Sequence, residues 1–276
     1  MTETQAAGTP TSATATLRVE HDGPVATILL DNQSMRNAVT HAMWQQFVPV
    51  LSDLDRDATT KVVVVRGAGK HFSAGADISA LREILHDPAT GQSDGGSVTA
   101  AENALSEFRK PTIAAIDGYC VGGAWQIAGA CDIRLASENA IFGITPAKIG
   151  IVYPLSGIRR LVSLVGPAAA KFLLFSGDFV NAEEALRFGM VARILDNQTY
   201  WEEIRQFAEH LALRSQFSTQ AHKDLVNAIA DGAPDLADRN DFWQREMALG
   251  VDSSAGIGAF LAKETPQFPW LRPQLR

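Results

Sequence analysis

The sequence contains few cysteines, no excess of basic residues and no long apolar run. Only Cys120 and Cys131 are cysteines among 276 residues, which argues against a disulfide framework and suits a reducing compartment. The net charge of −7 argues against a nucleic-acid-binding surface, which needs a basic face. No apolar run approaches the ~20 residues of a membrane span. We therefore expect a cytoplasmic globular protein that binds neither nucleic acid nor membranes.

Several common motifs are also missing. The glycine-punctuated stretch at 67–78, GAGKHFSAGADI, has neither the spacing of a phosphate-cradling P-loop nor that of a dinucleotide fingerprint. The six histidines show no ligand spacing, so no metal site is predicted. Residues 1–16 are small and polar and lack the basic start and apolar centre of a signal peptide, which predicts a disordered tail.

Short apolar runs alternate with helical patterns over the first two-thirds of the chain. The predicted strands are 25–30, 61–66, 112–116, 132–136 and 140–142, and the predicted helices of this part include 101–109, 167–175 and 181–188. Asn37 is a plausible N-cap for a helix in which Pro49 predicts a kink or an early stop. The stretch 85–99, rich in Gly, Asp and Ser, predicts a mobile surface loop.

The last quarter of the chain is helical in pattern. Helices are predicted near 200–214, 218–231, 236–249 and 254–262. We therefore predict an α/β (α+β) core over 17–199 and a helical region over 200–276. Periodicity alone leaves open whether the core is an open doubly wound sheet or a wound spiral.

The central stretch at 117–137, DGYCVGGAWQIAGACDIRLAS, carries the clearest functional signal. Gly122 and Gly123 precede a predicted helix, and a glycine pair there allows close backbone approach. The unpaired N–H groups at a helix start favour negative charge. The stretch therefore predicts a place where a developing anion is held.

The order and spacing of several short segments resemble the crotonase (enoyl-CoA hydratase/isomerase) superfamily over about residues 17–265. The segments are RNA at 36–38, FSAGAD at 72–77, KPTIAAIDG at 110–118, Gly122-Gly123, CDI at 131–133, NAEEAL at 181–186 and GIGAFLAK at 256–263. The resemblance implies a ββα spiral core followed by a helical trimerisation region. It also implies an acyl-CoA thioester as substrate, with no cofactor beyond the coenzyme A of that substrate, and a homotrimer or dimer of trimers.

The resemblance assigns the thioester oxygen to two backbone N–H groups, those of Ala76 and Gly123. Such preorganised donors stabilise a thioester enolate, whose charge lies on that oxygen, and losing one typically costs ~10²–10³ in rate. Arg36 is also a candidate partner for a CoA phosphate, with a solvated turn residue as the alternative. The positions implied to bind substrate are Arg36, Ala38, Ala74, Gly75, Ile78, Gly122, Trp125, Gln126, Pro146, Phe260 and Lys263, the last two often across a subunit boundary.

The sequence departs from the family at its catalytic acids. Family hydratases place two glutamates around a water, and the matching positions here are Gln126 and Pro146. Neither side chain serves as a general base, and the segment 150–157 contains no carboxylate. Two-glutamate hydration is therefore not expected, and we expect a site without carboxylates, which suits an anionic substrate group.

Tyr153 is the remaining catalytic candidate. The run ITPAKIGIVY at 144–153 resembles methylmalonyl-CoA decarboxylase-type members, in which the tyrosine could orient a leaving carboxylate or protonate the enolate. A packed core tyrosine is the alternative. The sequence thus predicts an enzyme that stabilises a thioester enolate, decarboxylase-like or a non-standard hydratase or isomerase. An inactive acyl-CoA-binding protein is the alternative.

Overall fold

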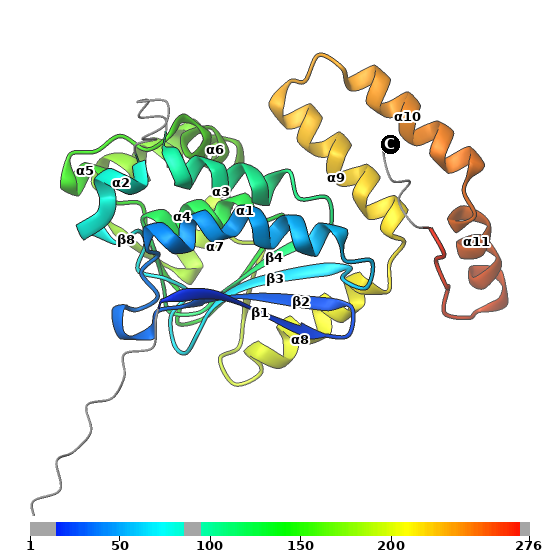
Figure 1. Ribbon diagram of the computed structural model, residues 1–276, viewed down its shortest axis with the longest axis horizontal. Coiled ribbons are helices and arrows are strands. Elements are labelled where there is room, and N and C mark those ends of the chain that lie inside the picture. Colours follow the sequence, from blue (N-terminus) through cyan, green and yellow to red (C-terminus); the bar gives the residue numbers. More distant parts are fainter. Residues whose placement is uncertain (1–14, 86–94, 271–276) are drawn as a thin grey trace, which may run out of the picture.

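The computed structural model describes residues 15–85 and 95–270, and its main element is a six-stranded sheet (Figure 1). The strand order is β1-β2-β3-β4-β6-β9, with β1 and β2 antiparallel and the other neighbours parallel. Its strands are β1 (Thr16–Asp22), β2 (Val25–Asp31), β3 (Val62–Gly67), β4 (Thr112–Ile116), β6 (Ile133–Ser137) and β9 (Arg193–Leu195). Every residue of β4 is buried, as expected for a parallel strand covered on both faces.

Helices cover both faces of this sheet. One face packs against α1 (His41–Arg56), α3 (Gly96–Ser106) and α4 (Gly123–Ala130), which share a large apolar core with the sheet. The opposite face packs against α8 (Tyr200–Ala212), through a smaller cluster that includes Tyr200 and Ile204. Figure 1 shows the sheet between these two layers.

A second, three-stranded sheet completes the core. It consists of β5 (Tyr119–Val121), β7 (Ile141–Gly143) and β8 (Phe179–Asn181), in the order β5-β7-β8. Because β5 follows β4 directly and leads into α4, this sheet carries the chain to the glycine pair. The remaining helices of the core are α2 (Leu81–Leu85), α5 (Pro146–Ile149), α6 (Leu155–Ser176) and α7 (Ala182–Phe188).

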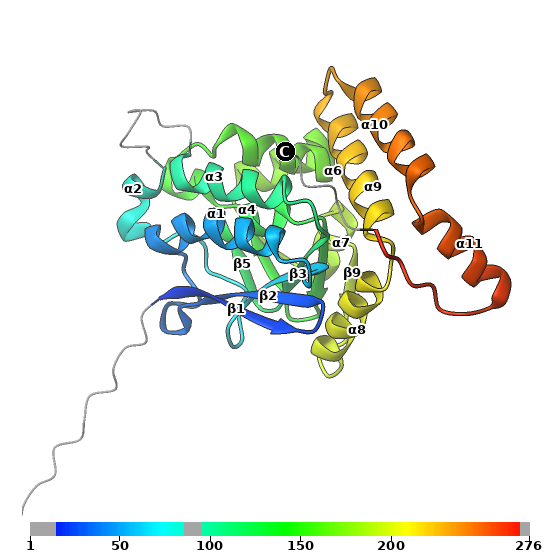
Figure 2. The ribbon, with the colours of Figure 1, turned by 45° about the vertical axis from the view of Figure 1, so that its right-hand side comes forward.

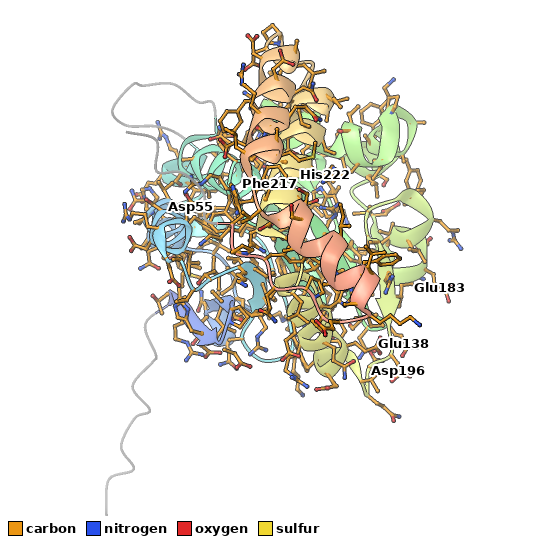
Figure 3. All side chains as sticks on the ribbon, turned by 90° about the vertical axis from the view of Figure 1, so that its right-hand side faces the viewer. Asp55, Glu138, Glu183, Asp196, Phe217 and His222 are labelled. Carbon is orange, nitrogen blue, oxygen red and sulfur yellow. The ribbon has the colours of Figure 1, made fainter. Side chains whose placement is uncertain are left out.

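The C-terminal helices project from the core. They are α9 (Gln216–Asp231), α10 (Leu236–Leu249) and α11 (Asp252–Ala262). Figures 1 and 2 show α10 and α11 on the far side of α9 from α1, α3 and α4. Phe217, labelled in Figure 3, lies in contact with the Trp243 and Trp270 rings, with ring centroids 5.9 and 5.7 Å away. An aromatic cluster therefore joins α9, α10 and the segment after α11.

Several predictions about local structure are confirmed. The strands at 25–30, 61–66 and 112–116 match β2, β3 and β4 to within a residue or two. Helix α7 has the predicted capping box between Asn181 and Glu184 and ends at Gly189, whose φ is +80°. Cys120 and Cys131 are free and buried, and burial raises the pKa of both thiols, that of Cys131 to about 12.

Other predictions are wrong. Asn37 is no N-cap: it is buried with φ +57°, and its amide donates to the carbonyls of Ala68 and His71, while Thr40 caps α1. Of the two alternatives predicted at Pro49, the early stop is wrong because α1 continues to Arg56, and the kink stays a prediction. Within the predicted loop at 85–99, residues 96–99 begin α3, because the apolar side chain of Val98 and those that follow at helical spacing pack into the core.

The predicted tail falls mostly outside the described residues. Residues 1–14 lie there, and so do 86–94 of the predicted surface loop. Thr16, the last residue assigned to the tail, instead begins β1. This edge strand was not predicted because only Leu17 of its seven residues is buried, and the sequence there contains no apolar run that would indicate a strand.

Candidate active site

Two chain segments run side by side and converge at the start of α4. The N–H of Phe72 donates to the Asp117 carbonyl at 2.7 Å, and that of Ser73 to the Tyr119 carbonyl at 2.8 Å. The N–H of Val121 then donates back to Ser73 at 3.2 Å. This pairing brings the loop of residues 74–77 against the glycine pair, although the two lie nearly fifty residues apart in the sequence.

The N–H groups of Ala76 and Gly123 meet at this point. A Cβ added to Gly123 would lie 3.1 Å from the Ala76 nitrogen, and one added to Gly75 would lie 3.2 Å from the Gly123 nitrogen. Gly123 is the first residue of α4 and has no intrahelical acceptor for its N–H. Within residues 15–85 and 95–270, the Ala76 N–H also lacks an acceptor. We call these two donors the backbone pair.

Glycines at 75 and 122 make the convergence possible. Gly75 has φ +101°, and a Cβ there would lie 2.5 Å from the Val121 carbonyl oxygen. Gly122, at the N-cap of α4, has φ +58°. An L side chain at either position would be strained, and at Gly75 it would also collide with backbone.

The segment at 36–38 fixes the loop from its other side. The Ala74 N–H donates to the Arg36 carbonyl at 2.9 Å, and the Ser73 hydroxyl donates to the Asn37 carbonyl at 2.7 Å. The backbone segments around Ala38 and Ala74, both implied by the resemblance to bind substrate, therefore lie side by side. The Arg36 side chain is exposed and lies over the Tyr119 ring, 5.4 Å from its centroid.

Tyr153 lies beside the glycine pair. A Cβ added to Gly122 would be 3.8 Å from both the Tyr153 hydroxyl and the Thr145 hydroxyl. Tyr153 is buried, and within the described residues its hydroxyl makes no hydrogen bond of regular geometry. Burial raises the pKa of this hydroxyl, a rise that the nearby Thr145 backbone opposes. Burying a hydroxyl without a hydrogen-bond partner costs free energy of folding. Such a hydroxyl is therefore unusual for a tyrosine that only packs in the core.

A buried carboxylate, that of Glu102, lies close to Gln126, which is three residues after Gly123 on α4. It comes from α3, and its side chain is 0% exposed. A Cβ added to Gly157 would lie 3.1 Å from its Oε1 and 2.8 Å from Gln126 Nε2. That amide nitrogen is itself buried and has no hydrogen-bond partner in the part of the chain described. Glu102 and Gln126 therefore approach the same point, where α3, α4 and α6 meet.

Glu102 is held by two residues of α6. Ser156 Oγ donates to Oε2 at 2.7 Å, and Arg160 donates to Oε1 at 3.2 Å. Burial raises the pKa of Glu102 to about 7, although the Ser156 hydrogen bond and the Arg160 charge both oppose this rise. We call Glu102, Gln126, Tyr153, Ser156 and Arg160 the polar cluster.

Glu102 was not among the site residues predicted from the sequence. The signal was present: Val98, Ala101 and Leu105 form the buried stripe of α3, and Glu102 lies within that stripe. A charged residue on the apolar face of a helix is rarely buried unless it is paired with another polar group or has a functional role. Glu102 was not predicted because it precedes the glycine pair by some twenty residues and lies in none of the segments that resemble the family.

The remaining residues predicted to bind substrate differ in their burial and in where they lie relative to the backbone pair. Trp125 is buried in the core, with its ring edge-on to Phe142, and Pro146 is buried at the first position of α5. Ile78, beside the loop, is 70% exposed. Phe260 and Lys263 lie in and just after α11, which Figure 1 shows beyond α9. Within one chain, the structure does not bring these last two residues to the backbone pair.

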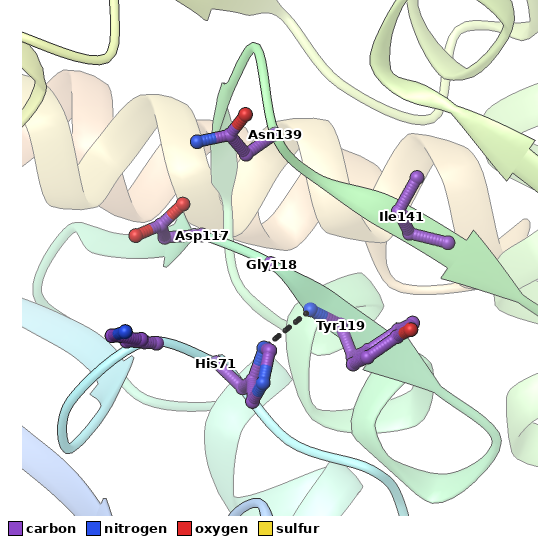
Figure 4. A pocket seen from close by; sticks show the side chains of 7 residues that line it. His71, Asp117, Gly118, Tyr119, Asn139 and Ile141 are labelled. Carbon is purple, nitrogen blue, oxygen red and sulfur yellow. Dashed lines mark hydrogen bonds between the residues drawn. The ribbon is translucent and has the colours of Figure 1, made fainter.

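A pocket of about 350 Å³ lies at the opposite end of the paired segments (Figure 4). Its lining residues are Lys70, His71, Asp117, Gly118, Tyr119, Asn139 and Ile141. His71 Nδ1 accepts a hydrogen bond from the Tyr119 N–H at 3.4 Å, the dashed line of Figure 4. His71 is half-buried and belongs to this pocket rather than to the backbone pair.

Comparison with known proteins identifies first the fold and then the family. A solved structure of an enoyl-CoA hydratase/isomerase family member superposes with a TM-score of 0.89, at 39% identity over 95% of this chain and 99% of that chain. The fold is therefore crotonase-like, as predicted. The enoyl-CoA hydratase/isomerase family model matches residues 20–270, so the chain belongs to this family, which acts on acyl-CoA thioesters.

Relatives with different activities show similar identity. The chain is 32% identical to the 2,3-dehydroadipyl-CoA hydratase of Escherichia coli, over 91% of this chain and 98% of that protein. It is 29% identical to the peroxisomal Δ(3,5)-Δ(2,4)-dienoyl-CoA isomerase of Arabidopsis thaliana, over 91% of this chain and 95% of that protein. Overall similarity therefore does not select one reaction. Among the described residues, no helix is long and apolar enough to cross a membrane.

Proposed function

We propose that this protein is an acyl-CoA enzyme that stabilises a thioester enolate at the backbone pair. The observation that carries the proposal is the convergence of two unpaired N–H donors, Ala76 and Gly123, at the start of a helix. An enolate concentrates its charge on the thioester oxygen, and two fixed donors there stabilise it without reorganisation. The positive end of the α4 dipole adds to the same effect.

We further propose that the reaction is not two-glutamate hydration. Gln126 and Pro146 occupy the positions where the family resemblance expects carboxylates, and neither can take a proton from water. The unpartnered hydroxyl of Tyr153, next to Gly122, supports a role for this tyrosine at the reacting carbons. Decarboxylation and double-bond isomerisation both pass through the enolate and need no activated water.

The test is exchange of the α-protons of butyryl-CoA with D₂O, followed by mass spectrometry. An enzyme that forms the enolate by removing an α-proton exchanges these protons, and butyrate without the thioester serves as the control. Turnover of crotonyl-CoA and methylmalonyl-CoA then separates hydration from decarboxylation. If the protein neither binds butyryl-CoA nor exchanges its protons, the proposal is wrong.

The alternative is an acyl-CoA-binding protein without catalysis. The replacement of both hydratase acids favours it, because binding alone can also maintain the backbone pair. It predicts butyryl-CoA binding in calorimetry together with no exchange and no turnover of any thioester in the panel. Binding and catalysis are thus separated in one set of measurements.

We also propose that the protein assembles as a trimer or as a dimer of trimers. Helix α11 carries exposed apolar side chains, with Phe260 82% and Leu261 75% exposed in a single chain. Surfaces of this kind are typical of interfaces. Assembly would bring Phe260 and Lys263 to a neighbouring chain's acyl-CoA. Light scattering after gel filtration tests the assembly, and a monomeric mass would contradict it.

A further inference from the structure

The structure places a buried carboxylate, that of Glu102, close to a position where the family resemblance expects a catalytic acid. Enolate formation requires a base for the α-proton, unless a carboxylate leaves instead. The two positions where the family resemblance expects acids hold Gln126 and Pro146. Glu102, from a helix that carries neither position, lies against Gln126.

We propose that Glu102 is the catalytic base and acid of this enzyme, an inference that rests on the proposed enolate chemistry. Its carboxylate removes a proton from the carbon next to the thioester carbonyl. The electron pair of the broken C–H bond forms the enolate double bond, and the carbonyl π pair moves to the oxygen held by the backbone pair. The protonated Glu102 then returns the proton to the same carbon or to the far end of a conjugated system.

The geometry supports this role on three counts. Glu102 Oε1 and Gln126 Nε2 both lie within about 3 Å of the position that a Cβ on Gly157 would occupy, and Gln126 is on the first turn of α4, three residues after Gly123. The missing side chain at Gly157 allows both groups to reach that point. Glu102 is also close enough to the Tyr153 hydroxyl for its charge to raise the pKa of that tyrosine. Glu102 is therefore near two of the buried polar side chains that have no hydrogen-bond partner among the described residues, Gln126 and Tyr153.

The environment of Glu102 suits proton transfer near neutral pH. With a pKa of about 7, both its forms are populated, which is the condition under which one group can take and return a proton. Arg160 is the one charged group that perturbs this pKa among the described residues, with the Ser156 hydroxyl as second partner.

The first experiment compares Glu102→Gln with the matched control Glu107→Gln. Glu107 is exposed at the end of the same helix, so its substitution tests the same chemical change away from the polar cluster. We expect Glu102→Gln to lower butyryl-CoA exchange by at least ~100-fold, with a butyryl-CoA Kd within about threefold of wild type. Glu107→Gln should leave both unchanged. Exchange by Glu102→Gln within twofold of wild type would overturn the inference.

The second experiment uses the pH profile and does not depend on Glu102→Gln folding. The base acts when deprotonated, so exchange should rise with pH through a limb near the pKa of Glu102. Ser156 and Arg160 both lower that pKa, so Ser156→Ala and Arg160→Gln should each move the limb to higher pH. A limb that stays in place in both variants would assign Glu102 a structural role only.

Failure of this inference is distinguishable from failure of the proposed function. If wild type neither binds nor exchanges butyryl-CoA, the enolate proposal itself is wrong. If wild type exchanges and Glu102→Gln exchanges equally well, the enolate proposal stands and another group transfers the proton.

Discussion

The first turn of α4 separates two regions that differ in what they are made of. On one side is the backbone pair, Ala76 and Gly123, which consists of main-chain N–H groups set by glycines. On the other is the polar cluster around Glu102, which consists of side chains from three helices and the segment before α6. The first region depends on local backbone conformation, and the second depends on how distant helices pack.

Because of this difference, we expect the two regions to respond differently to substitution. The backbone pair has no side chain to remove, so only a change in backbone shape can damage it. The polar cluster can be altered one functional group at a time without moving the main chain.

The substitution Gly75→Ala should abolish most activity. A Cβ at residue 75 would lie 2.5 Å from the Val121 carbonyl oxygen and 3.2 Å from the Gly123 nitrogen, at φ +101°. The loop must shift and the backbone pair must separate, so we expect a loss of ~10²–10³ in butyryl-CoA exchange.

The matched control for Gly75→Ala is Gly23→Ala. Gly23 has φ +54°, but a Cβ there meets nothing within 4 Å. It therefore carries the strain of a left-handed backbone without a collision at the site. Exchange should be unchanged in this variant. Equal losses in both variants would mean that general destabilisation, and not the backbone pair, controls activity.

Stability should depend on pH through Glu102. Its pKa rises from 4.5 to about 7 on folding, so the folded state binds the proton more tightly. The free energy of unfolding should therefore fall as pH rises from about 4.5 to 7, and the full cost of about 3 kcal/mol should be present above that range. Glu102→Gln has no carboxyl group at this position, so its free energy of unfolding lacks this dependence on pH. Urea unfolding should show the variant gaining stability relative to wild type between pH 4.5 and 8, and a constant difference would contradict the prediction.

The substitution Tyr153→Phe should separate activity from stability. The hydroxyl makes no regular hydrogen bond in the described structure, so its removal should change the free energy of unfolding by less than ~1 kcal/mol. If it donates to the reacting substrate, exchange or decarboxylation should fall by about tenfold to a hundredfold, the value of a hydrogen bond to a charged group. Unchanged kinetics would identify Tyr153 as a packed core residue.

The smallest effect is expected far from both regions. Asn181→Ala removes the side-chain acceptor of the α7 capping box and should cost about 1 kcal/mol of stability. Butyryl-CoA exchange should not change at a temperature well below melting. A parallel loss of exchange would show that activity follows stability in this protein, which would weaken the comparison between the two regions.

Much of the fold was predictable because its signals are local. The all-buried strand β4 and the box that caps α7 follow from residues that are neighbours in sequence. The edge strand β1 and the first turn of α3 were not predictable in the same way. They contain few apolar residues, and these are buried only through packing against elements that are distant in the sequence.

The amino-acid pattern alone indicates the family and the two segments, at 72–77 and 122–123, whose N–H groups converge. Glycine patterns identify these segments because few other residues adopt those backbone conformations. The approach of Glu102 to Gln126 became visible only in the folded chain, and so did the hydrogen bonds by which Asn37 ties two loops instead of capping a helix. The partners of a buried side chain come from other elements, so its protonation depends on how those elements pack.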